Sequence, residues 1–305
     1  MYQITPTDKR NINLGDRAFR GGDRAEALKY YLKAAENGND EAMLNCGQIY
    51  FEGIFGVEKN DDKAIEWFKK AGQLGNSAAL NNVGYIYGTL GNHRTAISWY
   101  EKAANLGDVV SMLNISNTYR QELNNKSKAR EWLQKAEKLS DSYSIRKVAD
   151  YYFNEDVIET HIDKAISLYR KAIRMGDMQA CKELGDLYFE IEDYEKAHHV
   201  YQKGANAGNV DCMVEMGLML FYIPDFFEEA KYWLKKAADK GHEYAFMLLG
   251  ELFEENMKYR RAIRWYKRAR AKGIEDADPK IRELNAYLKK TENVGCKLAG
   301  GSEFF

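Results

Sequence analysis

The sequence predicts an all-α protein, a right-handed α-solenoid of eight antiparallel helix pairs that ends in a C-terminal capping helix. Only three prolines occur in 305 residues, and a chain with so few helix breakers favours uninterrupted helices over strands and turns. A two-helix motif also recurs along most of the chain. Such a unit buries its apolar face only against its neighbours, so the recurrence predicts a continuous array.

An alanine followed three residues later by two large apolar side chains marks the second helix of each predicted pair. The alanines are Ala27, Ala64, Ala96, Ala129, Ala165, Ala197, Ala230 and Ala262. Five of the large pairs contain a tryptophan: Trp67, Trp99, Trp132, Trp233 and Trp265. Because the tryptophans recur in phase with the helices, we expect them in the core and not in a cofactor site.

A small residue marks the first helix of each pair, 20 residues after the alanine of the preceding pair. These residues are Gly47, Gly84, Ser116, Ala149, Gly185, Gly217 and Gly250. A large residue follows three positions later in each, a spacing that favours interlocked helix packing. The second helices end before a glycine, the usual left-handed helix stop, except that Ser140 stands where glycine is expected.

These landmarks divide the chain into four regions. We expect an N-terminal flank over residues 1–10, the repeat array over 11–276, a capping helix over 277–290 and a flexible tail over 291–305. Pro279 suits the start of the capping helix, and Ile281 and Leu284 give that helix an apolar side.

One repeat unit carries a family pattern. It reads Gly47-Gln-Ile-Tyr50 in its first helix and Lys63-Ala64-Ile-Glu-Trp67-Phe68 in its second. This unit resembles the Sel-one-like repeats, a tetratricopeptide-related family in which LGxxY precedes KAxxW[YF]xxAAxxG. The resemblance spans residues 11–276, and the constant 20-residue connector agrees with this family. It implies an adaptor or scaffold with no enzymatic activity of its own and no cofactor.

The residues themselves give no support for catalysis. The sequence contains no phosphate-binding glycine loop, no nucleophile elbow and no HExxH metal motif. The 45 Lys and Arg residues balance 46 Asp and Glu residues, so the overall charge does not favour a nucleic-acid or membrane-surface partner. Neither a membrane-spanning apolar run nor a secretory signal is found. A cytoplasmic protein is therefore expected.

The candidate binding site is a polar strip on the first helices of the second to sixth pairs. Asn45, Asn82 and Asn114 each lie two residues before the small residue of their helix, so stacked repeats would align them. An asparagine amide pairs with both the C=O and the N–H of an extended peptide. The alternative is that these asparagines belong to the repeat framework and bond to a neighbouring helix.

Asn117, Tyr85 and Arg120 continue the strip, and Arg146, Lys147 and Lys182 add positive charge beyond it. Cations favour a carboxylate ligand. We therefore expect a peptide or protein partner that carries an acidic residue or a C-terminal carboxylate.

The basic last repeat is the alternative surface, and it would recruit nucleic acid or an anionic surface. Its cations are Lys258, Arg260, Arg261, Arg264, Lys267, Arg268, Arg270 and Lys272. Acidic residues such as Glu251, Glu254 and Asp278 lie nearby in the sequence and favour an ordinary solvated face. No interleaved aromatic residues are expected at the surface for base stacking.

Overall fold

The computed structural model describes residues 6–21, 23–53, 57–154, 159–221 and 223–299. These residues form helices and turns and contain no strand. They divide into two compact units, Met1–Tyr152 and Phe153–Phe305. The first is called unit 1 and the second unit 2.

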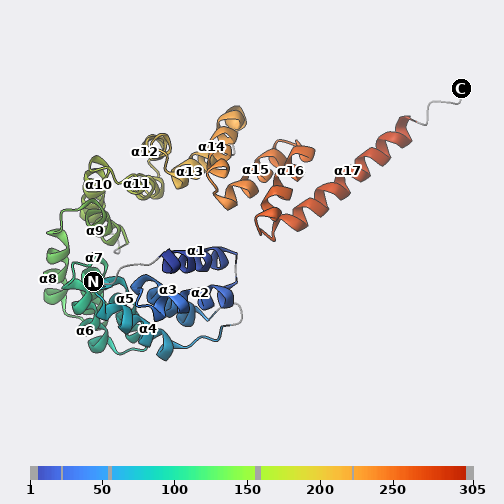
Figure 1. Cartoon of the computed structure of the whole chain (residues 1–305). Helices are drawn as coiled ribbons and strands as arrows, with labels where there is room; N and C mark the ends of the chain where they lie inside the picture. Colours follow the sequence, from blue (N-terminus) through green and yellow to red (C-terminus); the bar gives the residue numbers. More distant parts are fainter. Residues whose placement is uncertain (1–5, 22, 54–56, 155–158, 222, 300–305) are drawn as a thin grey trace, which may run out of the picture. The chain divides into compact units, whose positions relative to one another are not determined.

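Unit 1 contains four helix pairs, in which α1 packs on α2, α3 on α4, α5 on α6 and α7 on α8 (Figure 1). The helices are α1 (Pro6–Arg20), α2 (Arg24–Glu36), α3 (Asp40–Glu52), α4 (Asp61–Gln73), α5 (Ser77–Thr89), α6 (His93–Ala104), α7 (Val109–Asn117) and α8 (Lys126–Glu137). A π-helical turn, η1 (Thr118–Glu122), follows α7, and α9 (Ser142–Asn154) reaches the boundary between the units.

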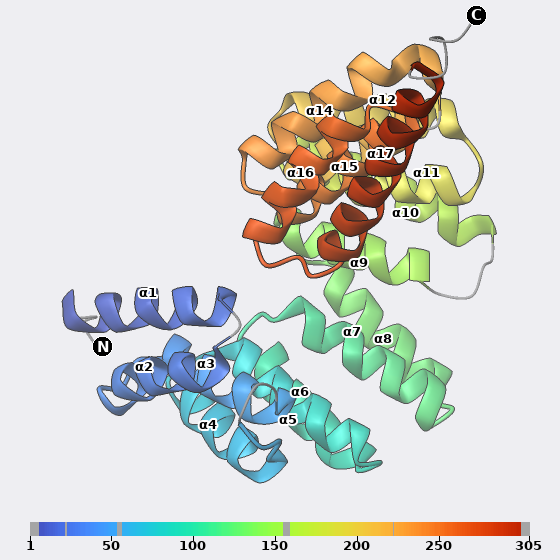
Figure 2. The ribbon, with the colours of Figure 1, turned by 90° about the vertical axis from the view of Figure 1, so that its right-hand side faces the viewer.

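Unit 2 contains three more pairs, α11 with α12, α13 with α14 and α15 with α16, and α17 packs on α16 (Figure 2). The helices are α10 (Glu159–Arg174), α11 (Gln179–Glu190), α12 (Tyr194–Asn206), α13 (Val210–Phe221), α14 (Phe227–Asp239), α15 (Glu243–Glu255), α16 (Tyr259–Ala271) and α17 (Ala277–Ala299). A short 3-10 turn, η2 (Pro224–Phe226), precedes α14. The predicted all-helical fold of repeated helix pairs is confirmed.

The connections between pairs share one arrangement, a helix end followed by a side chain that caps the next helix. Gly75 ends its pair with a φ of 96°, a conformation that glycine adopts without a side-chain clash. Asn76 follows and caps α5, because its side chain accepts a hydrogen bond of 3.0 Å from the Ala79 N–H. At the boundary where Ser140 replaces the glycine, the cap is still present. The side chain of Asp141 accepts a hydrogen bond of 2.8 Å from the Ser144 N–H at the start of α9.

Where the small residue of a first helix is a glycine, it lies against a ring or a leucine of the second helix in the same pair. A Cβ atom added at Gly47 would lie 2.5 Å from the Phe68 ring, and one added at Gly84 would lie 2.6 Å from the Tyr100 ring. Real Cβ atoms do not approach other atoms so closely. Glycine therefore allows the two helices of a pair to come together.

The prediction that the five tryptophans lie in the core is right for Trp233, which is 5% exposed. The other four, Trp67, Trp99, Trp132 and Trp265, are only half-buried, and Trp67 and Trp99 pack against the core from its edge. All five tryptophans are the first of the two large residues of their pair, about 100° around the helix from the second. Cations three residues later cover the open ring faces, with Lys70 Nζ 4.2 Å from the Trp67 ring centroid and Lys102 Nζ 3.5 Å from that of Trp99.

Both ends of the chain are helical where the structure describes them. Helix α1 begins at Pro6, inside the predicted flank, and α17 continues to Ala299, past the predicted end of the capping helix at Lys290. Residues 1–5 and 300–305 lie outside the described residues. None of the described helices is both long and apolar enough to cross a membrane.

Candidate functional site

A small cavity in unit 1 includes two residues of the predicted strip. It has a volume of about 240 Å³ and lies where α3 and α5, the first helices of consecutive repeats, meet Phe68 of α4. Its lining residues are Gln48, Phe51, Phe68, Asn81, Asn82, Tyr85 and Ile86. Asn82 and Tyr85 are the predicted site residues among them. The cavity offers amide groups beside aromatic rings.

The aromatic side of this cavity is partly open to solvent. Tyr85 is 50% exposed, and its ring meets that of Phe51 edge to face, with 5.9 Å between the ring centroids. Edge-to-face contact fixes the relative position of two rings. The pair therefore presents a preformed apolar surface next to Asn82.

Asn81 is a polar residue of this region that the predicted strip omitted. Its side-chain Oδ1 accepts hydrogen bonds from Asn114 Nδ2 at 2.9 Å and from Ser111 Oγ at 3.0 Å. The predicted site residue Asn114 thus bonds to the neighbouring first helix, as the framework alternative expected. The sequence alone marks Asn81 as unusual, because the adjacent repeats have leucine at the same position, Leu44 and Leu113.

The remaining strip residues of unit 1 lie on α3, α7, η1 and α9. Asn45 and Asn117 are half-buried, and Asn117 Oδ1 accepts from Arg120 Nη2 at 3.4 Å. The Arg146 guanidinium lies 5.4 Å from the centroid of the Tyr143 ring.

The positive charge of the strip is partly balanced within unit 1. Lys147 Nζ donates to Asp150 Oδ2 at 2.8 Å, an internal ion pair that competes with any external carboxylate. The contribution of Lys147 to recognition of an acidic partner is correspondingly reduced.

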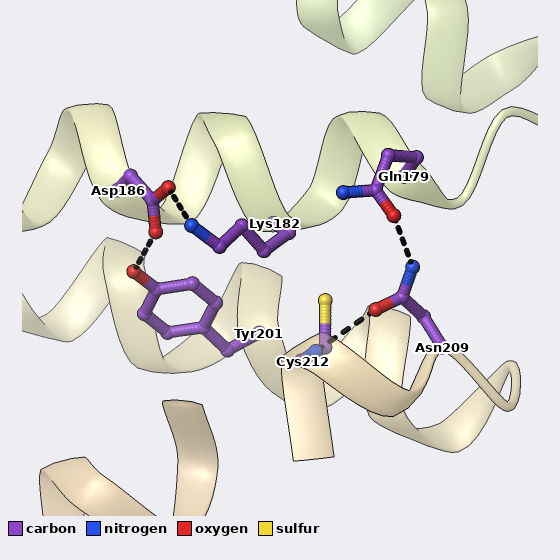
Figure 3. A network of polar contacts seen from close by, with 6 residues as sticks. All are labelled: Gln179, Lys182, Asp186, Tyr201, Asn209 and Cys212. Carbon is purple, nitrogen blue, oxygen red and sulfur yellow. Dashed lines mark hydrogen bonds and ion pairs between the residues drawn. The ribbon is translucent and has the colours of Figure 1, made fainter. Parts of the chain in front are cut away.

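Lys182 lies in unit 2, on α11, and belongs to a polar network there. Figure 3 shows Asp186 held between two donors, Lys182 Nζ at 2.6 Å and the Tyr201 hydroxyl at 2.7 Å. The same view shows Asn209, which caps α13 at the Cys212 N–H with a distance of 2.8 Å. Lys182 therefore belongs to a polar network of unit 2 that joins α11 to α12.

The cations of the basic last repeat have local partners. Arg270 Nη1 lies 3.2 Å from Asp278 Oδ1, and Lys258 Nζ lies 3.5 Å from the centroid of the Phe227 ring. The Arg268 guanidinium lies 4.5 Å from the centroid of the Trp265 ring. These contacts agree with a solvated charged face.

Two kinds of repeat model match the chain. The model described as Sel1 repeat matches residues 12–39, 40–76, 77–108, 142–177, 179–209, 210–242 and 248–274. A tetratricopeptide repeat model matches residues 109–143. That stretch contains the π-helical turn η1 and has Ser116 at the position of the first-helix glycine.

Known proteins share parts of this pattern. The ERAD-associated E3 ubiquitin-protein ligase component HRD3A of Arabidopsis thaliana is 32% identical over 66 residues, which are 22% of this chain and 10% of that protein. Yeast Tom70 has a solved structure with a TM-score of 0.62 at 16% identity, covering 99% of this chain and 69% of the Tom70 chain. That likeness concerns the fold.

A further solved structure comes from uropathogenic Escherichia coli strains and is a protective antigen displaying an SLR fold. It is 24% identical, has a TM-score of 0.46 and covers 92% of this chain and 65% of its own. Seven matches to the same repeat model extend over most of the sequence, from residue 12 to residue 274. The chain belongs to the Sel1 repeat family.

Proposed function

We propose that this chain is a non-enzymatic adaptor that binds a peptide or protein partner on the surface shared by its first helices, the concave surface of an α-solenoid. Proteins built from Sel1 and tetratricopeptide repeats are generally protein-interaction scaffolds. The observation that supports this proposal most is the cavity between α3 and α5, where amides lie beside the partly exposed Tyr85. A cytoplasmic location is part of the proposal.

The chemistry of the cavity suits an extended segment. Asn82 provides a donor and an acceptor that complement one peptide unit whatever side chain that unit carries. The rings of Tyr85 and Phe51 provide apolar contact for a neighbouring side chain. Arg120 and Arg146 add positive charge on the same unit, which favours a segment with an acidic residue or a C-terminal carboxylate.

Replacing Asn82 with alanine is expected to weaken binding about five- to hundredfold, because a bound peptide unit would lose its hydrogen-bond partner. The partner is first identified by affinity capture and mass spectrometry and then purified. Isothermal titration calorimetry measures its affinity for each variant of the full chain.

The matched control is Asn105→Ala, which removes an exposed amide at the end of α6, outside the cavity. This control should bind like the parent chain. If Asn82→Ala keeps both the parent affinity and the parent melting temperature, the α3–α5 cavity is not the binding site.

Reversing the charges of Arg260, Arg264 and Lys267 to glutamate is expected to change the affinity for the same partner by less than about threefold. All three side chains lie on α16. Because exposed ion pairs are worth about 0–1 kcal/mol each, a solvated face of this kind should contribute little to binding. The affinity is measured at several salt concentrations. Binding that disappears in the variant and weakens steeply with salt in the parent would instead favour the anionic-surface function.

A further inference from the structure

Unit 2 contains a larger cavity between two first helices of consecutive repeats, α11 and α13. Its volume is about 780 Å³. The residues that line it are Asp186, Phe189, Glu190, Glu192, Tyr194, Tyr201, Glu215, Leu218 and Met219. All of them belong to a single unit, so the cavity is defined without reference to unit 1.

This cavity occupies the same place in the repeat as the α3–α5 cavity of unit 1. Phe189 and Phe51 both lie four residues after the first-helix glycine, at Gly185 and Gly47 respectively. At the base of the two cavities, Tyr201 and Phe68 both lie four residues after the second-helix alanine. The same repeat positions therefore form two similar cavities.

The polar groups differ between the two cavities. Where unit 1 has Gln48, one residue after its glycine, unit 2 has Asp186, and where unit 1 has Asn82, two residues before its glycine, unit 2 has Glu215. Neutral amides in one cavity are thus replaced by carboxylates in the other. The ligand that complements them changes accordingly, from a peptide amide to a cation.

The carboxylates exceed the cations around the unit 2 cavity. Glu190, Glu192 and Glu215 line it together with Asp186, whereas no lysine or arginine does. Lys182 contacts Asp186 from the side and offsets one of these charges. Burial raises the pKa of Glu215, Lys182 opposes that rise, and Asp186 and Asp211 add repulsion. A bound cation would relieve this repulsion.

Aromatic rings complete the cavity. Phe189 is 48% exposed and Tyr194 is 50% exposed, and their rings meet at 71° with 5.1 Å between the centroids. Large exposed rings beside carboxylates attract a cation twice, through the ring face and through the ion pair. A guanidinium uses both, because it is planar, stacks on rings and donates in a fork to a carboxylate.

A metal ion fits this cavity less well. Among the residues that the structure describes, no three His, Cys, Asp or Glu side chains are grouped closely enough to hold a metal ion. The carboxylates are spread over a cavity of about 780 Å³, which suits an organic side chain.

We propose that the α11–α13 cavity binds an arginine side chain presented by an extended segment of a protein partner. Glu215 pairs with the guanidinium, and the edge-to-face pair of Phe189 and Tyr194 presents an exposed ring face to it. The carboxylates of Glu190 and Glu192 lie at exposed positions and attract the cation during approach. This site is separate from the amide cavity of unit 1 and does not depend on it.

The test uses two fluorescein-labelled peptides, Ala-Gly-Arg-Gly-Ala and the same sequence with citrulline in place of arginine. Citrulline keeps the shape of the side chain and removes its charge. Fluorescence anisotropy with the full chain should show binding of the arginine peptide at least about tenfold tighter than that of the citrulline peptide. A lysine peptide should bind with intermediate affinity.

Substitutions in the full chain test whether the arginine peptide binds in the α11–α13 cavity. Glu215→Gln should weaken the arginine peptide about tenfold, and Phe189→Leu about threefold, a step of about 0.7 kcal/mol at 25 °C that agrees with an exposed cation–π contact. The matched control is Glu195→Gln, which removes an exposed carboxylate of α12 that does not line this cavity. That control should bind like the parent chain.

Three outcomes would overturn the proposal: no detectable binding of the arginine peptide, equal binding of the two peptides, or unchanged binding by a folded Glu215→Gln variant. If Glu215→Gln fails to fold, the exposed Glu190→Gln takes its place and should weaken binding at least twofold. Asn82→Ala should leave the arginine peptide unaffected, so failure of the unit 1 site and failure of this site give different results.

Discussion

Replacing Phe68 with alanine is expected to lower the free energy of unfolding by about 3–5 kcal/mol. Phe68 is 0% exposed and its ring fills the space left by Gly47, so its removal creates a cavity that the helix backbones cannot close. The adjacent Trp67→Ala should cost only about 1–2 kcal/mol. Trp67 is half-buried at the edge of the core, and part of its ring faces Lys70 and solvent.

Urea unfolding followed by far-ultraviolet circular dichroism measures both variants without relying on tryptophan fluorescence, which Trp67→Ala would alter. The contrast between neighbours is the informative result, since the two substitutions lie in one helix and share its propensity. A Trp67→Ala variant that loses as much stability as Phe68→Ala would place the tryptophan, and not the phenylalanine, at the centre of the packing.

The helix pairs could be predicted because their determinants are local in the sequence. The alanine of each second helix is buried in all eight repeats, as at Ala64 and Ala197, and its regular spacing is visible without a structure. The turns are equally local, since a left-handed glycine followed by a capping side chain needs no distant partner. Local rules of this kind determined the fold class.

The choice between the two large residues of each pair could not be made from the same pattern. Trp67 and Phe68 are both large and apolar, and the repeat shows them together in phase. Their difference arises across the pair, where Gly47 leaves room for the ring of Phe68. Size alone favoured the tryptophan, whereas the position facing the glycine decides which side chain is buried.

The candidate site was predictable in part for a similar reason. The sequence phase put Asn82 and Tyr85 in one polar strip, and both line the α3–α5 cavity, but the phase could not show that Asn114 bonds to Asn81. An amide has several possible partners within reach, and three-dimensional packing selects among them. The carboxylate Glu215 shares the phase of Asn82, so comparison of the repeats with one another would have indicated it.

Gly84→Ala and Gly88→Ala are expected to change stability in opposite directions, although both replace a glycine in helix α5. Alanine is favoured over glycine inside a helix by about 1 kcal/mol. At Gly88 the nearest atoms to an added Cβ, in Ala96 and Tyr100, lie 3.8 Å away, which is ordinary contact. Gly88→Ala should therefore raise the free energy of unfolding by about 0.5–1 kcal/mol.

At Gly84 an added Cβ would lie 2.6 Å from two carbons of the Tyr100 ring. Tyr100 is buried at 5% exposure, so its ring cannot turn away, and the helices of the pair must separate. Overpacking of this kind costs about 1–3 kcal/mol and outweighs the gain in helix propensity. Thermal and urea unfolding of the two variants beside the parent chain measure the difference. Equal stabilisation by both substitutions would mean that the close approach of α5 and α6 does not limit the packing.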